Sequence, residues 1–217
     1  MKHLGNAIFF TTALLLPLIV SAGDPPISGP TSAKAPSVTG SPAALIEETS
    51  TQVRALLLTE NGKNTDAVRA QVQAVLFPRF DFVRMTALAV GKNWRQATDT
   101  QKIALEEQFK TLLTRTYFMT VLRYRDAKIN VLPNVEIANN GKEATVKSEV
   151  MVANAQAPVA INYVLYNTTA GWKVFDVRVE GASLVIVYRN QFNDEVSKGG
   201  IDGLIASLRN KNSAPPK

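Results

Sequence analysis

The chain has 217 residues, a formal net charge of +6 and no cysteine. Its single histidine, His3, lies at the very start, so the rest of the chain lacks cysteine and histidine nucleophiles, histidine general bases and most zinc sites. The basic residues are dispersed rather than gathered in a run, which disfavours a nucleic-acid-binding tail.

The first 22 residues have the pattern of a secretory signal peptide. A short basic start is followed by an apolar run from Leu4 to Val20 and by a small-residue end at Ala22. The run is short for a membrane span and contains polar residues and a proline, so a membrane anchor is the weaker alternative. We therefore expect residues 1–22 to be a cleaved signal and the protein to reside in the periplasm, where nucleic acid is not a partner.

The composition divides the remaining chain into three segments. Residues 23–42 are mostly Pro, Gly, Ser and Thr, which cannot bury enough apolar surface to offset the entropy of ordering. We expect a disordered tether at 23–42, one domain at 43–210, and a flexible tail at 211–217.

Helical signals occupy the first half of the domain. Three helices are expected before residue 95, and each has recognisable start or stop residues. These signals are Ser41-Pro42 and Asn61-Gly62 for the first helix, Pro78 for the end of the second, and Asp81 and Gly91 for the third.

A longer helix follows. Thr98 and Gln101 have the spacing of a capping box, in which each side chain satisfies a backbone N–H of the other residue. Apolar residues recur at helical spacing from Leu105 to Tyr124, and charged residues populate the other side. This pattern predicts an amphipathic helix of about 25 residues.

After Asp126 the spacing of the apolar residues changes from the helical period of about 3.6 residues to the strand period of two. Strands are expected around 129–132 and over 144–152, 159–165 and 173–179, with Phe175, Val177 and Val179 sharing one face. Polar residues alternate with valines in the 144–152 segment, which is typical of a strand with one wet face. We therefore predict a four-stranded antiparallel sheet.

The end of the domain returns to helix. Gly181 turns the chain, Ser183 can cap a helix, and Gly199-Gly200 separates that helix from a short closing one. Helices, then a sheet, then helices give an α+β fold.

No motif for catalysis is evident. The sequence has no phosphate-binding loop and no G-x-S-x-G motif. Asp81, Asp176 and Glu180 are the remaining candidates, since a carboxylate pair can act as acid and base in a glycosidase. The favoured interpretation is structural: Asp81 caps a helix and Glu180 braces a turn. We expect no cofactor and no metal.

Three sequence blocks together resemble the MlaC (toluene-tolerance) family. They are Ala87–Gly91 with Trp94, Thr98, Gln101, Phe109, Leu113 and Tyr117; Trp172–Val177 followed by Glu180–Leu184; and Gly200–Leu204. Their order and spacing carry the resemblance, which covers residues 43–210.

The resemblance implies a phospholipid carrier rather than an enzyme. Such a carrier moves lipid between an outer-membrane lipoprotein complex and an inner-membrane ABC transporter complex, and so maintains outer-membrane lipid asymmetry. The implied fold is a curved sheet packed with helices around a deep apolar pocket, and the implied form is a monomer. The alternatives are a carrier of another lipid such as a hopanoid, an exported enzyme on the same fold, and a periplasmic adaptor with a solid core.

Apolar residues from the long helix, the sheet and the following turn are expected to hold the lipid tails. The full set is Leu88, Tyr117, Val121, Val150, Val152, Ile161, Tyr163, Leu165, Val177, Val179, Ala182, Leu184, Val187 and Tyr188.

Basic residues cluster where the long helix gives way to the sheet. Arg123, Arg125 and Lys128 are expected to dock acidic partner surfaces or lipid headgroups. The alternative is a solvated helix end, where basic residues interact favourably with the helix dipole.

Overall fold

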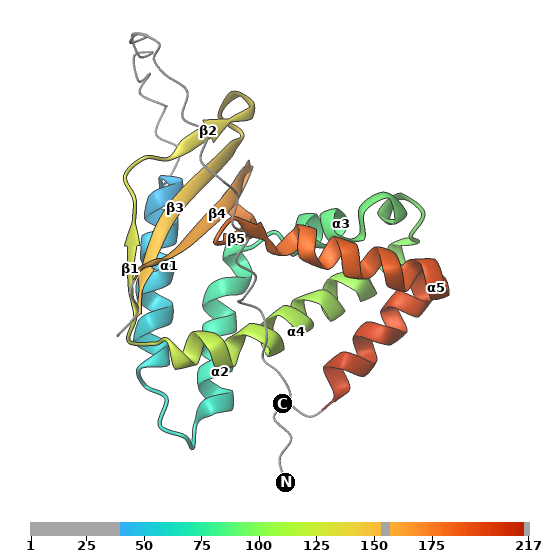
Figure 1. Ribbon diagram of the computed structural model, residues 1–217, viewed down its shortest axis with the longest axis horizontal. Coiled ribbons are helices and arrows are strands. Elements are labelled where there is room, and N and C mark those ends of the chain that lie inside the picture. Colours follow the sequence, from blue (N-terminus) through green and yellow to red (C-terminus); the bar gives the residue numbers. More distant parts are fainter. Residues whose placement is uncertain (1–39, 153–156, 215–217) are drawn as a thin grey trace, which may run out of the picture. The chain divides into compact units, whose positions relative to one another are not determined.

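The computed structural model describes residues 40–152 and 157–214. These residues form five α-helices and six strands in the expected order of helices, sheet and helix (Figure 1), which confirms the α+β class. The expected signal peptide, and the expected tether up to residue 39, lie outside the described residues.

The first three helices lie where they were expected, and the first and third begin at the expected capping residues. They are α1 (Pro42–Leu57), α2 (Thr65–Leu76) and α3 (Phe82–Val90), with a short 3-10 turn after α2 (η1, Phe77–Arg79) and another after α3 (η2, Gly91–Arg95). Ser41 Oγ accepts the N–H of Ala44 at 3.1 Å, and Asp81 Oδ1 accepts that of Arg84 at 2.9 Å. Each bond satisfies a backbone donor that has no partner within the helix.

The long helix α4 (Asp99–Arg123) has both bonds of the expected capping box. Gln101 N donates to Thr98 Oγ1 at 3.2 Å, and Thr98 N donates to Gln101 Oε1 at 2.9 Å. The N-terminal half of α4 buries Leu105 and Phe109 in the main core, whereas its C-terminal half buries Phe118 with α1 and α2. One helix therefore connects two hydrophobic clusters.

The sheet is antiparallel and has six strands rather than the four expected. The strands run in the order β1-β3-β4-β5-β6, and β2 also pairs with β3. The two unexpected strands have three and two residues, too few to show an alternating pattern in the sequence. The bounds are β1 (Lys128–Val131), β2 (Glu136–Ala138), β3 (Glu143–Met151), β4 (Val159–Thr168), β5 (Gly171–Val179) and β6 (Ala182–Ser183).

A β-bulge in β5 overturns one expectation about the sheet. Val164 pairs with Asp176 but Leu165 pairs with Val174, so Phe175 is the extra residue. Phe175 consequently lies in the cluster that also contains Val164, whereas Val177 packs with the cluster on the other face. The expected strict alternation from 173 to 179 is therefore wrong at Phe175.

Each face of the sheet packs against different helices. On one, hereafter the α1 face, Ile46 of α1 packs with Val146, Leu165 and Val174. On the other, hereafter the α5 face, Phe175 and its neighbours join the core formed by α3, α4 and α5. Both faces are apolar, so β4 and β5 are central to the fold.

The α5 face is also held by an arginine from α3. The guanidinium carbon of Arg84 lies 4.0 Å from the ring centre of Tyr166 and 4.4 Å from that of Phe175. The same side chain forms an ion pair with Glu143 at 2.9 Å. Stacking and charge pairing together fix α3 on β3, β4 and β5.

The last helix, α5 (Leu184–Ser213), begins where Ser183 Oγ accepts the N–H of Ile186 at 3.1 Å. Gly200 has φ 66°, which breaks the helix at the expected Gly199-Gly200 pair. Helix continues to Ser213, and Asn212 donates to the carbonyl of Gln108 at 2.9 Å. Residues 211–213 were expected to be flexible and are helical instead, because they pack along α4.

The capping box yields a stability prediction. Replacing Thr98 with Ala should lower the free energy of unfolding by about 1 kcal/mol, because the N–H of Gln101 loses its acceptor. Urea denaturation followed by circular dichroism measures the change. Thr100→Ala, at an exposed position of the same helical turn, is the matched control. Equal effects of the two substitutions would show that the box does not stabilise α4.

Candidate functional site

Part of the α1 face forms a continuous apolar surface. In antiparallel pairs, residues directly opposite one another share a face. Val150 pairs with Val159, Tyr163 with Val177, and Ile161 with Val179. Val179 in turn pairs with Ala182 of β6. We call this set the apolar face: Val150, Val159, Ile161, Tyr163, Val177, Val179 and Ala182.

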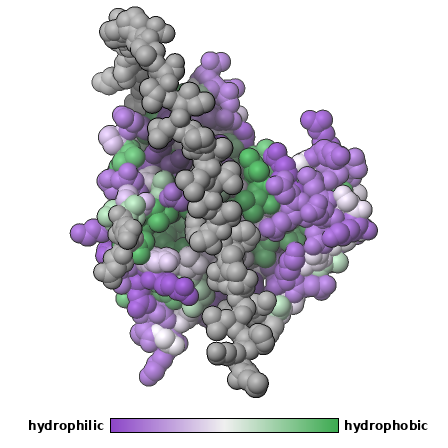
Figure 2. Space-filling view, in the orientation of Figure 1, coloured by the Kyte–Doolittle hydropathy of each residue, from purple (hydrophilic) through white to green (hydrophobic). Residues whose placement is uncertain are grey.

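Helix α1 covers only one end of the α1 face. Beneath it, Val146 and Leu165 are fully buried. Farther along the strands, Val150 is buried, whereas Ile161, Val177 and Val179 are only partly buried and Ala182 is exposed. The space-filling view in Figure 2 shows hydrophobic residues, coloured green, exposed at the molecular surface. Apolar side chains left partly open in this way are suited to contact an apolar ligand.

Several other expected residues lie near the ends of these elements. On α4, Val121 is 43% exposed. On the first turn of α5, Leu184 is partly buried and Val187 is 38% exposed. Val152 follows β3 directly and is partly buried. These residues remain accessible for a ligand.

Four expected residues are core positions instead. Leu165 is buried beneath α1. Tyr188 is buried among Phe109 and Phe192, with ring centres 5.0 and 5.7 Å from its own. Leu88 and Tyr117 pack against the same cluster. That cluster lies on the α5 face, so none of these three residues reaches the apolar face. Helical spacing is identical for core and ligand-lining residues, which is why the sequence did not separate them.

The apolar face contains one hydroxyl group, that of Tyr163, and no ionised side chain, and Ser148 lies beside it opposite Ile161. Ser148 donates to the carbonyl of Ile161 at 2.8 Å, so its hydroxyl is satisfied by β4. Burial raises the pKa of Tyr163 above its ordinary value, because the phenolate would lose its hydration. The surface is therefore uncharged at neutral pH.

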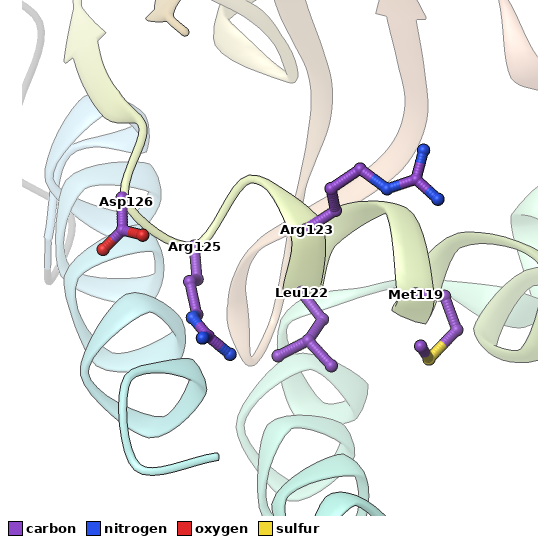
Figure 3. A pocket seen from close by; sticks show the side chains of 5 residues that line it. All are labelled: Met119, Leu122, Arg123, Arg125 and Asp126. Atoms are coloured by element: carbon purple, nitrogen blue, oxygen red, sulfur yellow. The ribbon is translucent and has the colours of Figure 1, made fainter. Parts of the chain in front are cut away.

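The three basic residues expected to dock partners do not act alike. Arg125 forms an ion pair with Glu60 at 3.0 Å, between the end of α4 and the α1–α2 connection. Arg123 and Lys128 are exposed. Figure 3 shows the side chains of Arg123 and Arg125 pointing in different directions from the end of α4. Arg125 thus braces the end of α4 against the α1–α2 connection.

Arg123 and Arg125 also line a shallow pocket of about 290 Å³ at the end of α4, with Met119, Leu122 and Asp126 (Figure 3). Its lining mixes charged and apolar side chains and comes from α4 and the turn that follows. The pocket contains none of the residues of the apolar face.

The carboxylates considered for catalysis all have structural partners. Asp176 is buried and accepts from Ser183 Oγ at 2.7 Å and from Val185 N at 3.2 Å, which joins β5 to the start of α5. Glu180 accepts from Ala160 N at 2.5 Å, and Asp81 caps α3. Each carboxylate stabilises a turn or a helix start, as the structural interpretation predicted for Asp81 and Glu180.

Residues 40–152 and 157–214 contain no group of three or more acidic or histidine side chains placed to hold a metal ion. In the same part of the chain, no helix combines the length and the hydropathy needed to cross a membrane.

Comparison with known proteins places this chain among lipid-associated relatives. The sequence model of the MlaC protein family matches residues 47–210. Toluene tolerance protein ttg2D of Pseudomonas putida is 34% identical over 108 residues, which span 50% of this chain and about half (49%) of the relative. The intermembrane phospholipid transport system binding protein MlaC of Haemophilus influenzae is 22% identical over 150 residues, 68% of this chain and 70% of that protein.

One solved structure is similar over most of this chain. The phospholipid-binding protein from Ralstonia solanacearum, determined in complex with a phospholipid, superposes with a TM-score of 0.71 and 33% sequence identity. The match covers 79% of this chain and 96% of the Ralstonia chain. The two folds therefore agree over nearly the whole of that structure.

The ion pair at the end of α4 predicts a pH dependence. Hydrogen bonds from Thr65 and Gly62, and then Arg125, lower the pKa of Glu60 below its ordinary value of 4.5. A carboxyl with a lowered pKa stabilises the folded state above its unfolded pKa, and loses this effect as the pH falls through the folded value. Glu60→Gln should therefore destabilise the protein by more at neutral pH than at about pH 3, which lies below the ordinary pKa of a glutamate.

Urea titrations of both proteins at the two pH values provide the measurement. Glu107→Gln, on the exposed side of α4, is the control and should have little effect at either pH. A destabilisation by Glu60→Gln that is the same at both pH values would contradict the ionic role of Glu60.

Proposed function

Because the chain belongs to the MlaC family, we propose that it is a periplasmic phospholipid carrier whose apolar face contacts the acyl tails. The observation that carries this proposal is the partly open apolar face, in a fold that matches a phospholipid-bound structure at 33% identity. The family is one of lipid-binding proteins, and the function is binding rather than catalysis.

Physical chemistry favours an apolar, uncharged contact surface for such a carrier. Burying one methylene is worth about 0.8 kcal/mol, so removing two full tails from water is worth on the order of 20 kcal/mol. A bilayer offers nearly the same gain. A carrier that must both load and release lipid therefore needs to match the bilayer, and valine, isoleucine and tyrosine side chains suffice for that.

We further propose that the protein is a shuttle that carries phospholipid between two membrane complexes. The Haemophilus relative is named as the binding protein of an intermembrane phospholipid transport system. The partners would be an outer-membrane lipoprotein complex and an inner-membrane ABC transporter complex, and the effect would be to maintain outer-membrane lipid asymmetry. The protein would act as a monomer and would need no cofactor.

Ala182 provides the sharpest test of the lipid site. It is exposed on β6, opposite Val179, at the open end of the apolar face. Ala182→Glu should remain folded, because an exposed carboxylate can be hydrated. It should nevertheless lose bound phospholipid, because a carboxylate covered by a tail would lose its water without gaining a partner.

Lipid extraction and mass spectrometry of the purified variant give the bound lipid, and circular dichroism reports folding. Ala206→Glu, an exposed alanine on α5 outside the apolar face, is the matched control and should keep its lipid. A folded Ala182→Glu protein with a full complement of lipid would exclude this end of the apolar face from the site.

The basic residues predict a separate effect on transfer. We propose that Arg123 and Lys128 attract acidic surfaces, while Arg125 is occupied by Glu60. The double variant Arg123→Glu/Lys128→Glu should slow delivery of lipid to phosphatidylglycerol vesicles and reduce the salt dependence of delivery, with bound lipid unchanged. Transfer of a fluorescent phospholipid measures the rate. An unchanged rate would leave these residues as an ordinary solvated helix end.

A further inference from the structure

The turn between β5 and β6 has an unusual backbone conformation at Glu180. Glu180 has φ 50° and Gly181 has φ 81°, so two successive residues lie in the left-handed region. Glycine adopts this conformation freely, whereas a residue with a Cβ atom does so at a cost in free energy. A glutamate in this position therefore directs attention to the contact that its side chain makes.

The side chain of Glu180 completes the pairing of β4 with β5. Glu180 N donates to the carbonyl of Ala160 at 2.9 Å, and the N–H of Ala160 donates to Glu180 Oε1 at 2.5 Å. In a regular antiparallel pair, that second N–H would donate to a backbone carbonyl of the neighbouring strand. Here the carboxylate is the acceptor, so the pairing extends to a position where the chain has already begun to turn away.

These two hydrogen bonds lie at the open end of the apolar face. Ala160 stands between two of its members, Val159 and Ile161, and Glu180 directly follows a third, Val179. Ile161 and Val179 form the last pair in the register of β4 with β5 at this end. Glu180 supplies two hydrogen bonds beyond that pair, and thereby holds the first residues of β4 against the β5–β6 turn.

We propose, on the basis of the proposed function, that Glu180 is a positioning residue that slows the release of phospholipid. Its carboxylate contacts the backbone of β4 and need not touch the lipid. Without this acceptor, the N–H of Ala160 is unpaired and the strained turn can relax, which separates Ile161 from Val179. Water then reaches an acyl tail that covers this part of the apolar face, and the lipid dissociates faster.

Three substitutions at this exposed position separate the hydrogen bond from the backbone strain and from the charge. Glu180→Gly removes the acceptor and also relieves the positive φ, so the variant should fold. Glu180→Asn is a second variant of the same kind, because asparagine tolerates the left-handed region and its side chain is one methylene shorter. Glu180→Gln removes the charge but keeps an oxygen acceptor of the same reach, and should restore the behaviour of the unmodified protein.

The experiment measures the transfer of a fluorescent phospholipid from the full chain to an excess of phosphatidylcholine vesicles. Glu180→Gly and Glu180→Asn should release the lipid roughly tenfold faster than the unmodified protein, and Glu180→Gln should stay within about twofold of it. Amide hydrogen exchange followed by NMR reports on the contact itself. The amide of Ala160 should exchange faster in the first two variants and at the original rate in the third.

A residue that merely stabilised the fold would change lipid release in step with the free energy of unfolding. Thr98→Ala is the control for this alternative, because it removes another bond between a side chain and a backbone N–H, at the start of α4 and outside the apolar face. It should lower the stability in urea and leave the rate of lipid release unchanged.

Three results would overturn the proposal. The first is faster exchange at Ala160 in Glu180→Gly with no faster release of lipid. The second is release by Glu180→Gln as fast as that by Glu180→Gly, which would assign the effect to the charge. The third is faster release by Thr98→Ala to the same extent, which would make retention a consequence of overall stability.

The proposed function can fail separately. If the unmodified protein takes up no phospholipid, the proposed function is wrong and the role of Glu180 in retention falls with it. If the unmodified protein holds phospholipid and Glu180→Gly releases it no faster, only the role of Glu180 is wrong.

Discussion

The structure depends on the β-bulge between β4 and β5. With strict alternation Phe175 would share a face with Val177 and Val179, and α3 and α5 would have few apolar residues to pack on. The bulge turns Phe175 to the α5 face, where it joins Val164 in the main core, and leaves Val177 on the α1 face. Both faces of the same two strands are therefore apolar, and both must be covered.

The two faces are covered to different extents, and the proposed function follows from this asymmetry. Helices α3, α4 and α5 close the α5 face around fully buried residues such as Leu105 and Phe109. Helix α1 closes only part of the other face. Asp176, through Ser183 and the start of α5, holds the β5–α5 corner at the open end. A stable core thereby supports the apolar face, which in the proposed function is covered by an acyl chain.

Local signals in the sequence predicted much of this fold and less of the site. Thr98, Gln101 and Ser183 indicate helix starts in the sequence, because capping is a contact between residues that are close together in the chain. The bulge has no such signal, since Phe175 fits the alternation of its strand. Tyr188 and Val177 look equally suited to lipid, and only the pairing of distant elements separates a core residue from an open one. The same holds for Arg125, whose partner Glu60 is 65 positions away.

Native mass spectrometry tests the central claim most directly. The full chain, expressed with residues 1–22 and purified from the periplasm without detergent, should carry phospholipid in a complex that survives transfer to the gas phase. The mass of the released molecule identifies its headgroup and tails. A folded preparation that contains only the unliganded protein would contradict the account, and a bound lipid of another class, such as a hopanoid, would change the cargo.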